Sequence, residues 1–192
     1  FRQHRLAVAS LVVLLGLVVL AFVGGWLWKY SVADITPDES QPPSWNHPFG
    51  TDAAGRDTFA QVLRGTQISI GISVLVAIFS TLIGTIWGTV AGYYRGTVDT
   101  VMMRIADLLL TLPLIAVAAV LGHNTGGSWW LIAVVISGLS WAYVSRVVRG
   151  VVLSLREKEF IEAAKALGAS DARIIFRHLV PNALGPVIVN AT

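Results

Sequence analysis

Two long stretches without charged residues constrain what this chain can fold into. Residues 65–94 and 108–145 contain no Asp, Glu, Lys or Arg, and they are 30 and 38 residues long. About 20 apolar residues cross the hydrocarbon layer of a membrane as a helix, so the first stretch fits one span and the second fits two. Only 13% of all residues are charged, against about 25% in an ordinary soluble domain. The sequence therefore predicts a polytopic membrane protein.

The distribution of apolar residues predicts an all-α transmembrane helical bundle with five spans, the last one truncated. A helix satisfies its own backbone hydrogen bonds in lipid, and these runs are too long for barrel strands. Pro113 should bend the third span, either for packing or to line a cavity. Arg104 and Asp107, in the first turns of that span, can pair on one face. The expected spans are 6–28, 68–92, 101–121, 129–148 and one that begins near residue 183.

The first apolar run follows a short basic segment, as a signal peptide does. At 23 residues it is too long for one, and residues 24–26 are not a small-x-small cleavage site, so we expect a retained N-terminal anchor helix at 1–28. Phe1 in place of Met, and an apolar run that reaches Thr192, indicate that the chain continues at both ends.

The positions of Lys and Arg predict the orientation in the membrane. With the N-terminus in the cytoplasm, 11 of the 14 Lys and Arg residues lie on the inner side, and only Lys29, Arg56 and Arg64 lie outside. The interpretation is a multi-pass protein of the cytoplasmic membrane, with an extracytoplasmic segment at 29–67 and a helical core at 68–192.

The first half of the outer segment is expected to run over the surface without regular structure, because residues 36–48 are rich in Pro and polar residues. From Asp57 the sequence predicts a short interfacial helix. Gly50 to Asp57 has the glycine spacing of a phosphate-binding loop, but Arg56 and Asp57 occupy the positions where nucleotide chemistry needs Lys and Ser or Thr. A turn held by Asp52 and Asp57 is therefore the preferred interpretation over a nucleotide site.

Three glycines in the second span, Gly84, Gly88 and Gly92, are four residues apart and share one helix face. Missing side chains let another helix approach closely, so we expect a helix-packing stripe. The alternative is a moving seam along a translocation path.

No arrangement of residues predicts a chemical active site, a cofactor or a metal in this chain. The four His residues are scattered, no Cys occurs, and no nucleophile and base pattern appears. No carboxylate or Lys lies at mid-depth of a span, where ion-coupled transporters commonly place one. Energy for any transport should therefore enter from another subunit.

The inner loop reads as two short amphipathic helices joined at Gly168. Apolar residues from Phe160 to Leu167 recur at helical spacing beside a charged face, and Gly168 is a suitable C-terminal stop. Ser170 can cap the second helix with Asp171 at its positive end, and Pro181 should break it before the next span. The projection could lie on the membrane surface or dock a soluble partner.

The same loop resembles a motif of a known family. Glu162-Ala163-Ala164, then Gly168, then His178 to Pro181 resembles the EAA loop of ATP-binding-cassette importer permeases, although the usual Ile-x-Leu-Pro ending is altered at its first and third positions. Arg177 to Asn182 fits the Arg-His-x-x-Pro-Asn pattern of the subset that imports dipeptides, oligopeptides or nickel, and Gly50 to Asp57 is also typical of that subset. The resemblance covers nearly the whole chain.

The resemblance implies a type I importer permease fold, usually of six spans, in a non-catalytic subunit similar to the C-type subunit of a dipeptide permease. In that family the coupling loop, here 149–182, inserts a helix into a groove of the ATPase. Glu162 would face polar groups there, Ala163 and Ala164 would permit close approach, and Gly168 would permit the turn. ATP and Mg would bind to partner subunits.

The implied partners are a second permease subunit, two ATP-binding subunits, an extracytoplasmic substrate-binding protein and membrane lipid, with no nucleic acid. Peptides are the favoured substrate, and nickel or another small solute is the alternative within the family. From other classes, a self-sufficient secondary transporter or channel and a non-transporting scaffold stay open. The substrate-binding residues are not predicted.

Overall fold

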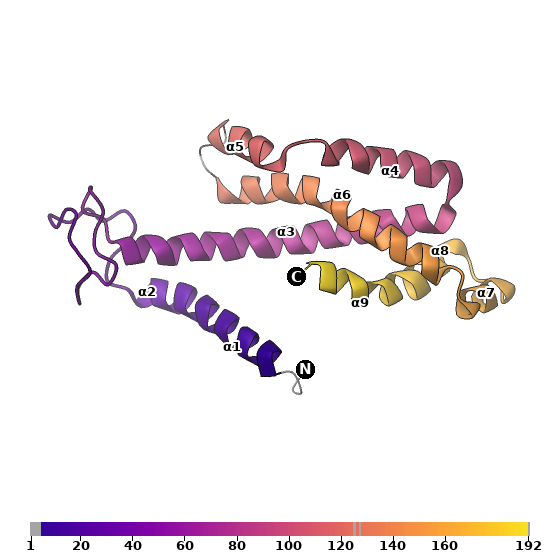
Figure 1. Cartoon of the computed structure of the whole chain (residues 1–192), viewed down its shortest axis with the longest axis horizontal. Helices are drawn as coiled ribbons and strands as arrows, with labels where there is room; N and C mark the ends of the chain where they lie inside the picture. Colours follow the sequence, from indigo (N-terminus) through magenta and orange to yellow (C-terminus); the bar gives the residue numbers. More distant parts are fainter. Residues whose placement is uncertain (1–4, 125, 127, 192) are drawn as a thin grey trace. The chain divides into compact units, whose positions relative to one another are not determined.

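A computed structural model of the chain describes residues 5–124, 126 and 128–191 (Figure 1). The regular elements of these residues are helices, with one isolated β-bridge between Thr51 and Asp57. Two compact units, Phe1–Gly71 and Ile72–Thr192, are described separately below. The prediction of an all-helical membrane protein is confirmed.

Three described helices are long and apolar enough to cross a membrane, Arg5–Leu27, Thr58–Tyr94 and Trp129–Leu155. A fourth span results if the bent pair Gly96–Leu110 and Leu114–His123 counts as one. The last helix, Val180–Ala191, has only 12 residues as described. Because about 20 are needed to cross, the count of five spans stays a prediction.

The first unit begins with one apolar helical run. It comprises α1 (Arg5–Val19), a π-helical stretch η1 (Leu20–Gly24) and α2 (Gly25–Leu27). Nearly all of its large apolar side chains are exposed, as a lipid-facing helix requires, and only Ala21 is buried. The carbonyl oxygen of Ala21 accepts a hydrogen bond from Nε2 of Gln67, at 2.8 Å.

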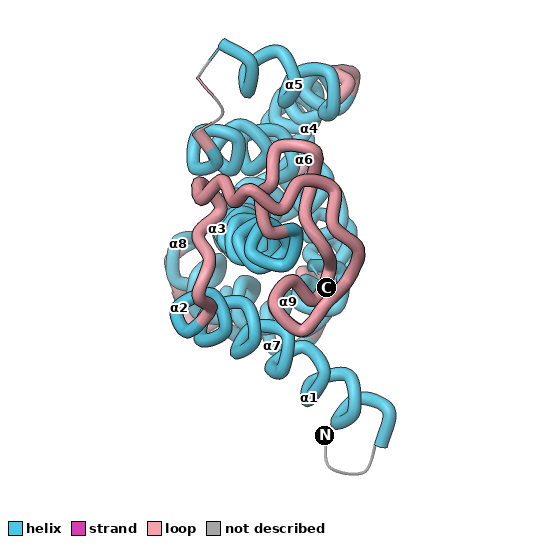
Figure 2. The backbone as a smooth tube through the Cα atoms, turned by 90° about the vertical axis from the view of Figure 1, so that its left-hand side faces the viewer, coloured by secondary structure: helices cyan, strands magenta, loops and turns pink. Residues whose placement is uncertain are grey.

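Residues 28–57 form loops, as their Pro content predicts (Figure 2). The carboxylate of Asp57, which is only 1% exposed, holds these loops together. Its Oδ1 accepts hydrogen bonds from the indole of Trp28 (3.1 Å) and from the backbone N–H of Ala60 (2.7 Å), and its Oδ2 lies 2.7 Å from Nδ1 of His47. Asp57 is therefore both the centre of the loop structure and the N-cap of the next helix.

The predicted turn at Gly50 to Asp57 is confirmed, and its Asp52 accepts hydrogen bonds from the backbone N–H groups of Ala54 and Arg56. The predicted separate interfacial helix is wrong. One continuous helix, α3 (Thr58–Tyr94), runs for 37 residues, or about 55 Å. No Pro follows Asp57 in this stretch, and an isolated Gly such as Gly65 does not end a helix.

The second unit contains the later turns of α3, then α4 (Gly96–Leu110), α5 (Leu114–Asn124) and α6 (Trp129–Leu155). The chain turns between α3 and α4 at Arg95 and Gly96, which have φ angles of 57° and 59°. Helices α4 and α5 are bent by 64° at a break that contains Pro113, which confirms the predicted bend. Helix α6 contacts both α4 and α5 (Figure 1).

Residues that flank Pro113 also line a cavity of about 590 Å³ in this unit. Its wall is mostly apolar, with Leu112 and Leu114 on either side of the proline, and it includes Ser140 and Tyr143 from α6. The bend therefore borders a partly open cavity, and lining a cavity was one of the two interpretations of the proline.

The three glycines of α3 lie directly against α6. A Cβ atom added to Gly84 would lie 2.6 Å from the Cβ atom of Val144, and one added to Gly92 would lie 3.0 Å from that of Val152. At Gly88 the added atom would overlap the carbonyl oxygen of Ser145. Real Cβ atoms do not approach as closely as those added at Gly84 and Gly88 would, so the contact between α3 and α6 requires glycine at these two positions, and it is tight at Gly92.

Two ion pairs join α4 to α6. Asp99 accepts two hydrogen bonds from the guanidinium of Arg149, both at 2.5 Å. Asp107 pairs with Arg146, whose Nε lies 3.1 Å from its carboxylate. The predicted pairing of Asp107 with Arg104 is therefore not formed. The order Arg then Asp is the weaker one within a helix, and Arg146 reaches the carboxylate from the neighbouring helix.

Candidate functional site

The segment predicted to couple to a partner, 149–182, is almost entirely helical. Helix α6 continues to Leu155, beyond the predicted end at Val148, because its arginines are paired with carboxylates of α4 and do not end the helix. It is followed by α7 (Glu159–Ala166), α8 (Asp171–Ile174), a π-helical stretch η2 (Ile175–Leu179) and α9 (Val180–Ala191).

One side of this segment forms a hydrophobic core with the ends of α3 and α6. Ile161 of α7 and Leu179 of η2 are fully buried in it, and Ala164 of α7 is 9% exposed. The core therefore fixes α7 to the two long helices. Its buried members are Tyr93, Val148, Val152, Ile161, Ile174, Ile175, Leu179 and Ala183.

The opposite side of α7 is exposed. Glu162 and Ala163 face away from the core, and Leu167 is 89% exposed. The structure thus separates the two alanines of the motif, with Ala163 outside and Ala164 inside.

Gly168 ends α7 in a left-handed conformation, with φ of 76°. The N–H of Ala169 bonds to the carbonyl of Ala164 at 3.0 Å, and the N–H of Gly168 bonds to that of Lys165 at 2.9 Å. These two bonds form a Schellman motif, the usual glycine ending of a helix. A Cβ atom at Gly168 would meet nothing within 4 Å, so the requirement for glycine lies in the backbone angle rather than in space.

Two polar contacts join the segment to the end of α3. The hydroxyl of Tyr93 donates a hydrogen bond of 2.6 Å to Oδ1 of Asp171, the first residue of α8. Above the Tyr93 ring lie the charged groups of Lys165 and Arg156, 5.5 and 5.8 Å from its centroid. At these distances both cations interact with the ring face. Tyr93 therefore contacts α6, α7 and α8.

Arg95, directly after α3, forms the second contact. Its Nη2 lies 2.6 Å from Oε1 of Glu157, in the turn between α6 and α7. The hydrogen bond and the positive charge of Arg95 lower the pKa of Glu157 below its ordinary value of 4.5. Contacts at Glu157 and Asp171 thus hold both ends of the segment that contains α7.

The predicted break at Pro181 is wrong, because a helical run continues from α8 through η2 into α9. The wider π-helical turn shifts the hydrogen bonds just before the proline, and Pro181 lies in the first turn of α9, where proline is tolerated. Asn182 also donates its side-chain amide to the carbonyl of His178, at 2.6 Å. Ser170 precedes α8 as predicted but forms no side-chain capping bond.

Sequence reasoning missed Tyr93, Arg95 and Glu157. The sequence did contain one indication of Tyr93 and Arg95. Both lie at the end of a long uncharged stretch, where aromatic and basic residues commonly mark the membrane surface. Their distant partners, 78 and 62 residues away, could not be read from the sequence. His47 was interpreted as an isolated histidine but lies against Asp57.

No group of three or more metal-binding side chains occurs together in the part of the chain that the structure describes. The site contains no paired nucleophile and base either. The geometry of the site suits a mechanical role, because an exposed helix of eight residues is attached at both ends to the core of a membrane protein.

Two family profiles match the chain. Residues 84–192 match the family described as "Binding-protein-dependent transport system inner membrane component", and residues 1–43 match "N-terminal TM domain of oligopeptide transport permease C". The first match covers the glycine stripe, α6 and the whole segment 149–182.

Similar proteins carry related names. An oligopeptide transport system permease protein OppC of Mycobacterium tuberculosis is 42% identical over all of this chain and 67% of its own length. A dipeptide transport system permease protein DppC of Bacillus subtilis is 39% identical, and an OppC of the same organism is 36% identical. The chain covers 60% and 63% of the lengths of these two relatives. The chain therefore belongs to the family of binding-protein-dependent transport system inner membrane components.

Proposed function

We propose that this chain is the permease subunit of an ATP-driven importer that moves dipeptides or oligopeptides across the cytoplasmic membrane. The observation that carries the proposal is the coupling projection, defined as α7 and the turn at Leu167 to Ala169. Its outer side exposes Glu162 and Ala163, and its inner side packs on α3 and α6. The names of the similar permeases support peptides, and nickel or another small solute is the alternative.

The importer would contain a second permease subunit, two ATP-binding subunits and an extracytoplasmic substrate-binding protein. ATP and Mg would bind to the ATP-binding subunits, and this chain would be non-catalytic. In this arrangement the chain contributes an anchor at 1–28, an extracytoplasmic segment at 29–67 and a permease core at 68–192 with the coupling loop 149–182. Five spans with a cytoplasmic N-terminus agree with the distribution of Lys and Arg, and the type I fold is what the family resemblance implies.

In the proposed mechanism, α7 inserts into a groove of an ATP-binding subunit. Glu162 faces polar groups of the groove, Ala163 permits close approach, and Gly168 permits the turn that returns the chain to the core. Ala164 faces inward, so it would act by letting α7 lie close to its own core.

Closure of the ATP-binding subunits on ATP would displace α7. The displacement would pass to α3 through the contacts Tyr93 with Asp171 and Arg95 with Glu157, and to α6 through the buried Ile161. The glycine contact between α3 and α6 would make the two helices move together, so that the permease pair changes from inward- to outward-facing.

The test replaces Ala163 by Trp and compares Ala172→Trp, an equally exposed alanine in α8 outside the coupling projection. Because Ala163 is exposed, the larger side chain should leave the fold intact and obstruct only a partner. We expect Ala163→Trp to abolish peptide uptake by the assembled transporter and co-purification of the ATP-binding subunits, while Ala172→Trp retains both.

Wild-type uptake and wild-type association of Ala163→Trp would contradict the docking assignment. Substrate flux in proteoliposomes that contain this subunit alone would instead support a self-sufficient transporter.

A further inference from the structure

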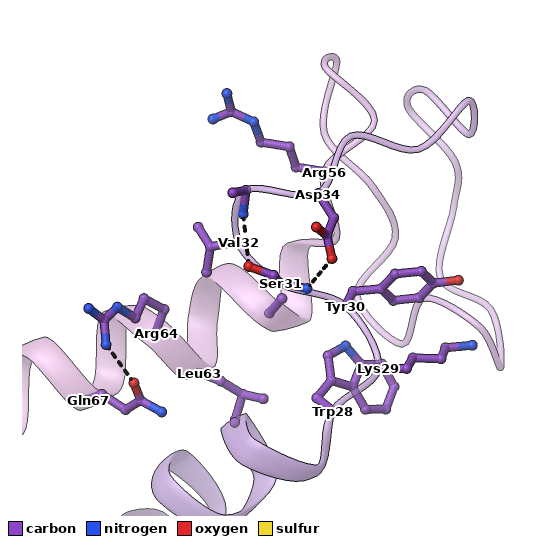
Figure 3. Close-up of a pocket in the computed structure, with 13 residues that line it drawn as sticks. Trp28, Lys29, Tyr30, Ser31, Val32, Asp34, Arg56, Leu63, Arg64 and Gln67 are labelled. Carbon is purple, nitrogen blue, oxygen red and sulfur yellow. Dashed lines mark hydrogen bonds between the residues drawn. The ribbon is translucent and has the colours of Figure 1, made fainter.

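The first unit contains a cavity of about 800 Å³ that the proposed function does not use (Figure 3). It lies between the end of α2, the residues that follow it and the first turns of α3. Helix α3 contributes Ala60, Leu63, Arg64 and Gln67, whose spacing places them on one face. The opposite wall comes from residues 28–34.

The lining carries excess positive charge. Lys29, Arg56 and Arg64 line the cavity, against a single acidic residue, Asp34. The carboxylate of Asp34 accepts a hydrogen bond of 2.7 Å from the backbone N–H of Ser31 (Figure 3). Within the described residues, neither arginine forms an ion pair within 4 Å, although Arg56 is near enough to Asp52 to help lower the pKa of that carboxylate. The guanidinium of Arg64 therefore has no acidic partner among these residues, and that of Arg56 has only this longer-range one.

Arg64 is nonetheless held in position by a neutral partner. Its Nη1 donates a hydrogen bond of 3.0 Å to Oε1 of Gln67, and Nε2 of Gln67 donates one of 2.8 Å to the carbonyl of Ala21 in η1. This chain of hydrogen bonds orients the guanidinium without neutralising it. Gly25 leaves the room for Gln67, because a Cβ atom there would overlap Nε2 of that side chain.

The lining residues lie at the ends of two candidate membrane spans. The apolar helical run ends at Leu27, and Trp28 and Tyr30 follow it in the lining. Arg64 is the last charged residue before 30 uncharged ones in α3. Aromatic and basic side chains at the ends of two spans mark the headgroup region of a bilayer.

We propose that this cavity binds the phosphodiester headgroup of an anionic phospholipid such as phosphatidylglycerol. Arg56 and Arg64 would donate hydrogen bonds to the phosphate oxygens, since guanidinium groups suit phosphate geometry. Leu63 and Val32 in the lining would contact the glycerol and the upper acyl chain. The apolar part of the lining and the interfacial level favour a lipid phosphate over a free one.

The test uses the complete transporter, purified in detergent and reconstituted into nanodiscs of phosphatidylcholine with or without phosphatidylglycerol. The variants are Arg56→Gln with Arg64→Gln, and Arg104→Gln as a control for the loss of an exposed arginine elsewhere. We expect wild-type protein to retain phosphatidylglycerol in native mass spectrometry and to unfold at a higher temperature in its presence. The double variant should retain severalfold less phosphatidylglycerol and lose most of the rise in unfolding temperature, while the control variant behaves as wild type.

Three results would overturn the proposal. A rise in the unfolding temperature with inorganic phosphate as large as the rise with phosphatidylglycerol would indicate a free-anion site. An equal rise for the double variant would show that the arginines do not bind lipid. Unchanged lipid retention together with lost capture of the extracytoplasmic binding protein would assign the cavity to a protein partner. If the double variant does not fold, the single variant Arg56→Gln tests the proposal by the same two measurements. It is expected to fold, because the side chain of Arg56 is exposed and forms no ion pair within the described residues.

Discussion

The hydroxyl of Tyr93, at the end of α3, donates a hydrogen bond of 2.6 Å to the carboxylate of Asp171, the first residue of α8. The contact bridges 78 residues of sequence, and Tyr93 is only 6% exposed. It connects the turn after α7 to a helix that crosses the membrane. The family motif around Glu162 contains neither residue.

Tyr93→Phe should reduce the coupling between ATP hydrolysis and transport. The change removes only the hydroxyl, and a hydrogen bond to a charged acceptor contributes about 1.5–3 kcal/mol. We expect the ATP-binding subunits still to co-purify, while peptide uptake per ATP hydrolysed falls by about tenfold or more. Asp171→Asn, which keeps an acceptor oxygen, should have a milder effect. An unchanged ratio in Tyr93→Phe would show that this contact does not transmit motion.

Gly88→Ala should destabilise the contact between α3 and α6. The new methyl group would overlap the carbonyl oxygen of Ser145, and overpacking of this kind costs about 1–3 kcal/mol. Gly65→Ala, in the same helix, meets nothing within 4 Å and should be neutral or slightly stabilising. Thermal unfolding in detergent compares the two variants, and equal unfolding temperatures would contradict the packing assignment.

Asp57→Ala should loosen the loops of residues 28–57. It removes the N-cap of α3 and leaves the indole of Trp28 and the ring of His47 without their acceptor, for a loss of roughly 3 kcal/mol or more. Limited proteolysis should then cleave this segment faster than in wild type. Glu39→Ala is the control, since Glu39 is an exposed acidic residue of the same loops, whereas Asp38 itself lies 3.8 Å from His47. Equal cleavage of the two variants would show that Asp57 does not organise the loops.

The ion pair between Arg95 and Glu157 should respond to acid. Arg95 lowers the pKa of Glu157 below 4.5, so the stabilisation is complete above the ordinary pKa and is lost as pH falls through the lowered one. The difference in unfolding temperature between wild type and Glu157→Gln should be constant between about pH 6 and 8 and should disappear only below about pH 4.5. A difference that changed within the neutral range would exclude Glu157 as its source.

Local sequence patterns predicted those features of the fold that depend on residues within a single helix. Uncharged length predicted the three long apolar helices, Pro113 predicted the bend, and Gly168 predicted the end of α7. The predictions about helix ends were less accurate. Paired arginines did not end α6 near Val148, and a π-helical turn let the chain pass Pro181.

Contacts between distant segments limited what the sequence could predict of the site. The motif indicated Glu162 and Gly168, but it did not reveal that Ala163 and Ala164 face opposite sides of α7. Asp107 lies three residues from Arg104 and yet pairs with Arg146, 39 residues away. Partner choice of this kind depends on how helices pack, and no periodicity within one helix contains that information.

The helical run from Asp171 to Ala191 has a mechanical consequence. Since α8, η2 and α9 follow one another without a break, they form a lever about 30 Å long whose short end adjoins Gly168. A tilt of one degree at that end would move the far end by roughly 0.5 Å. A few degrees of rotation would thus shift the far end of α9 by about the width of an atom.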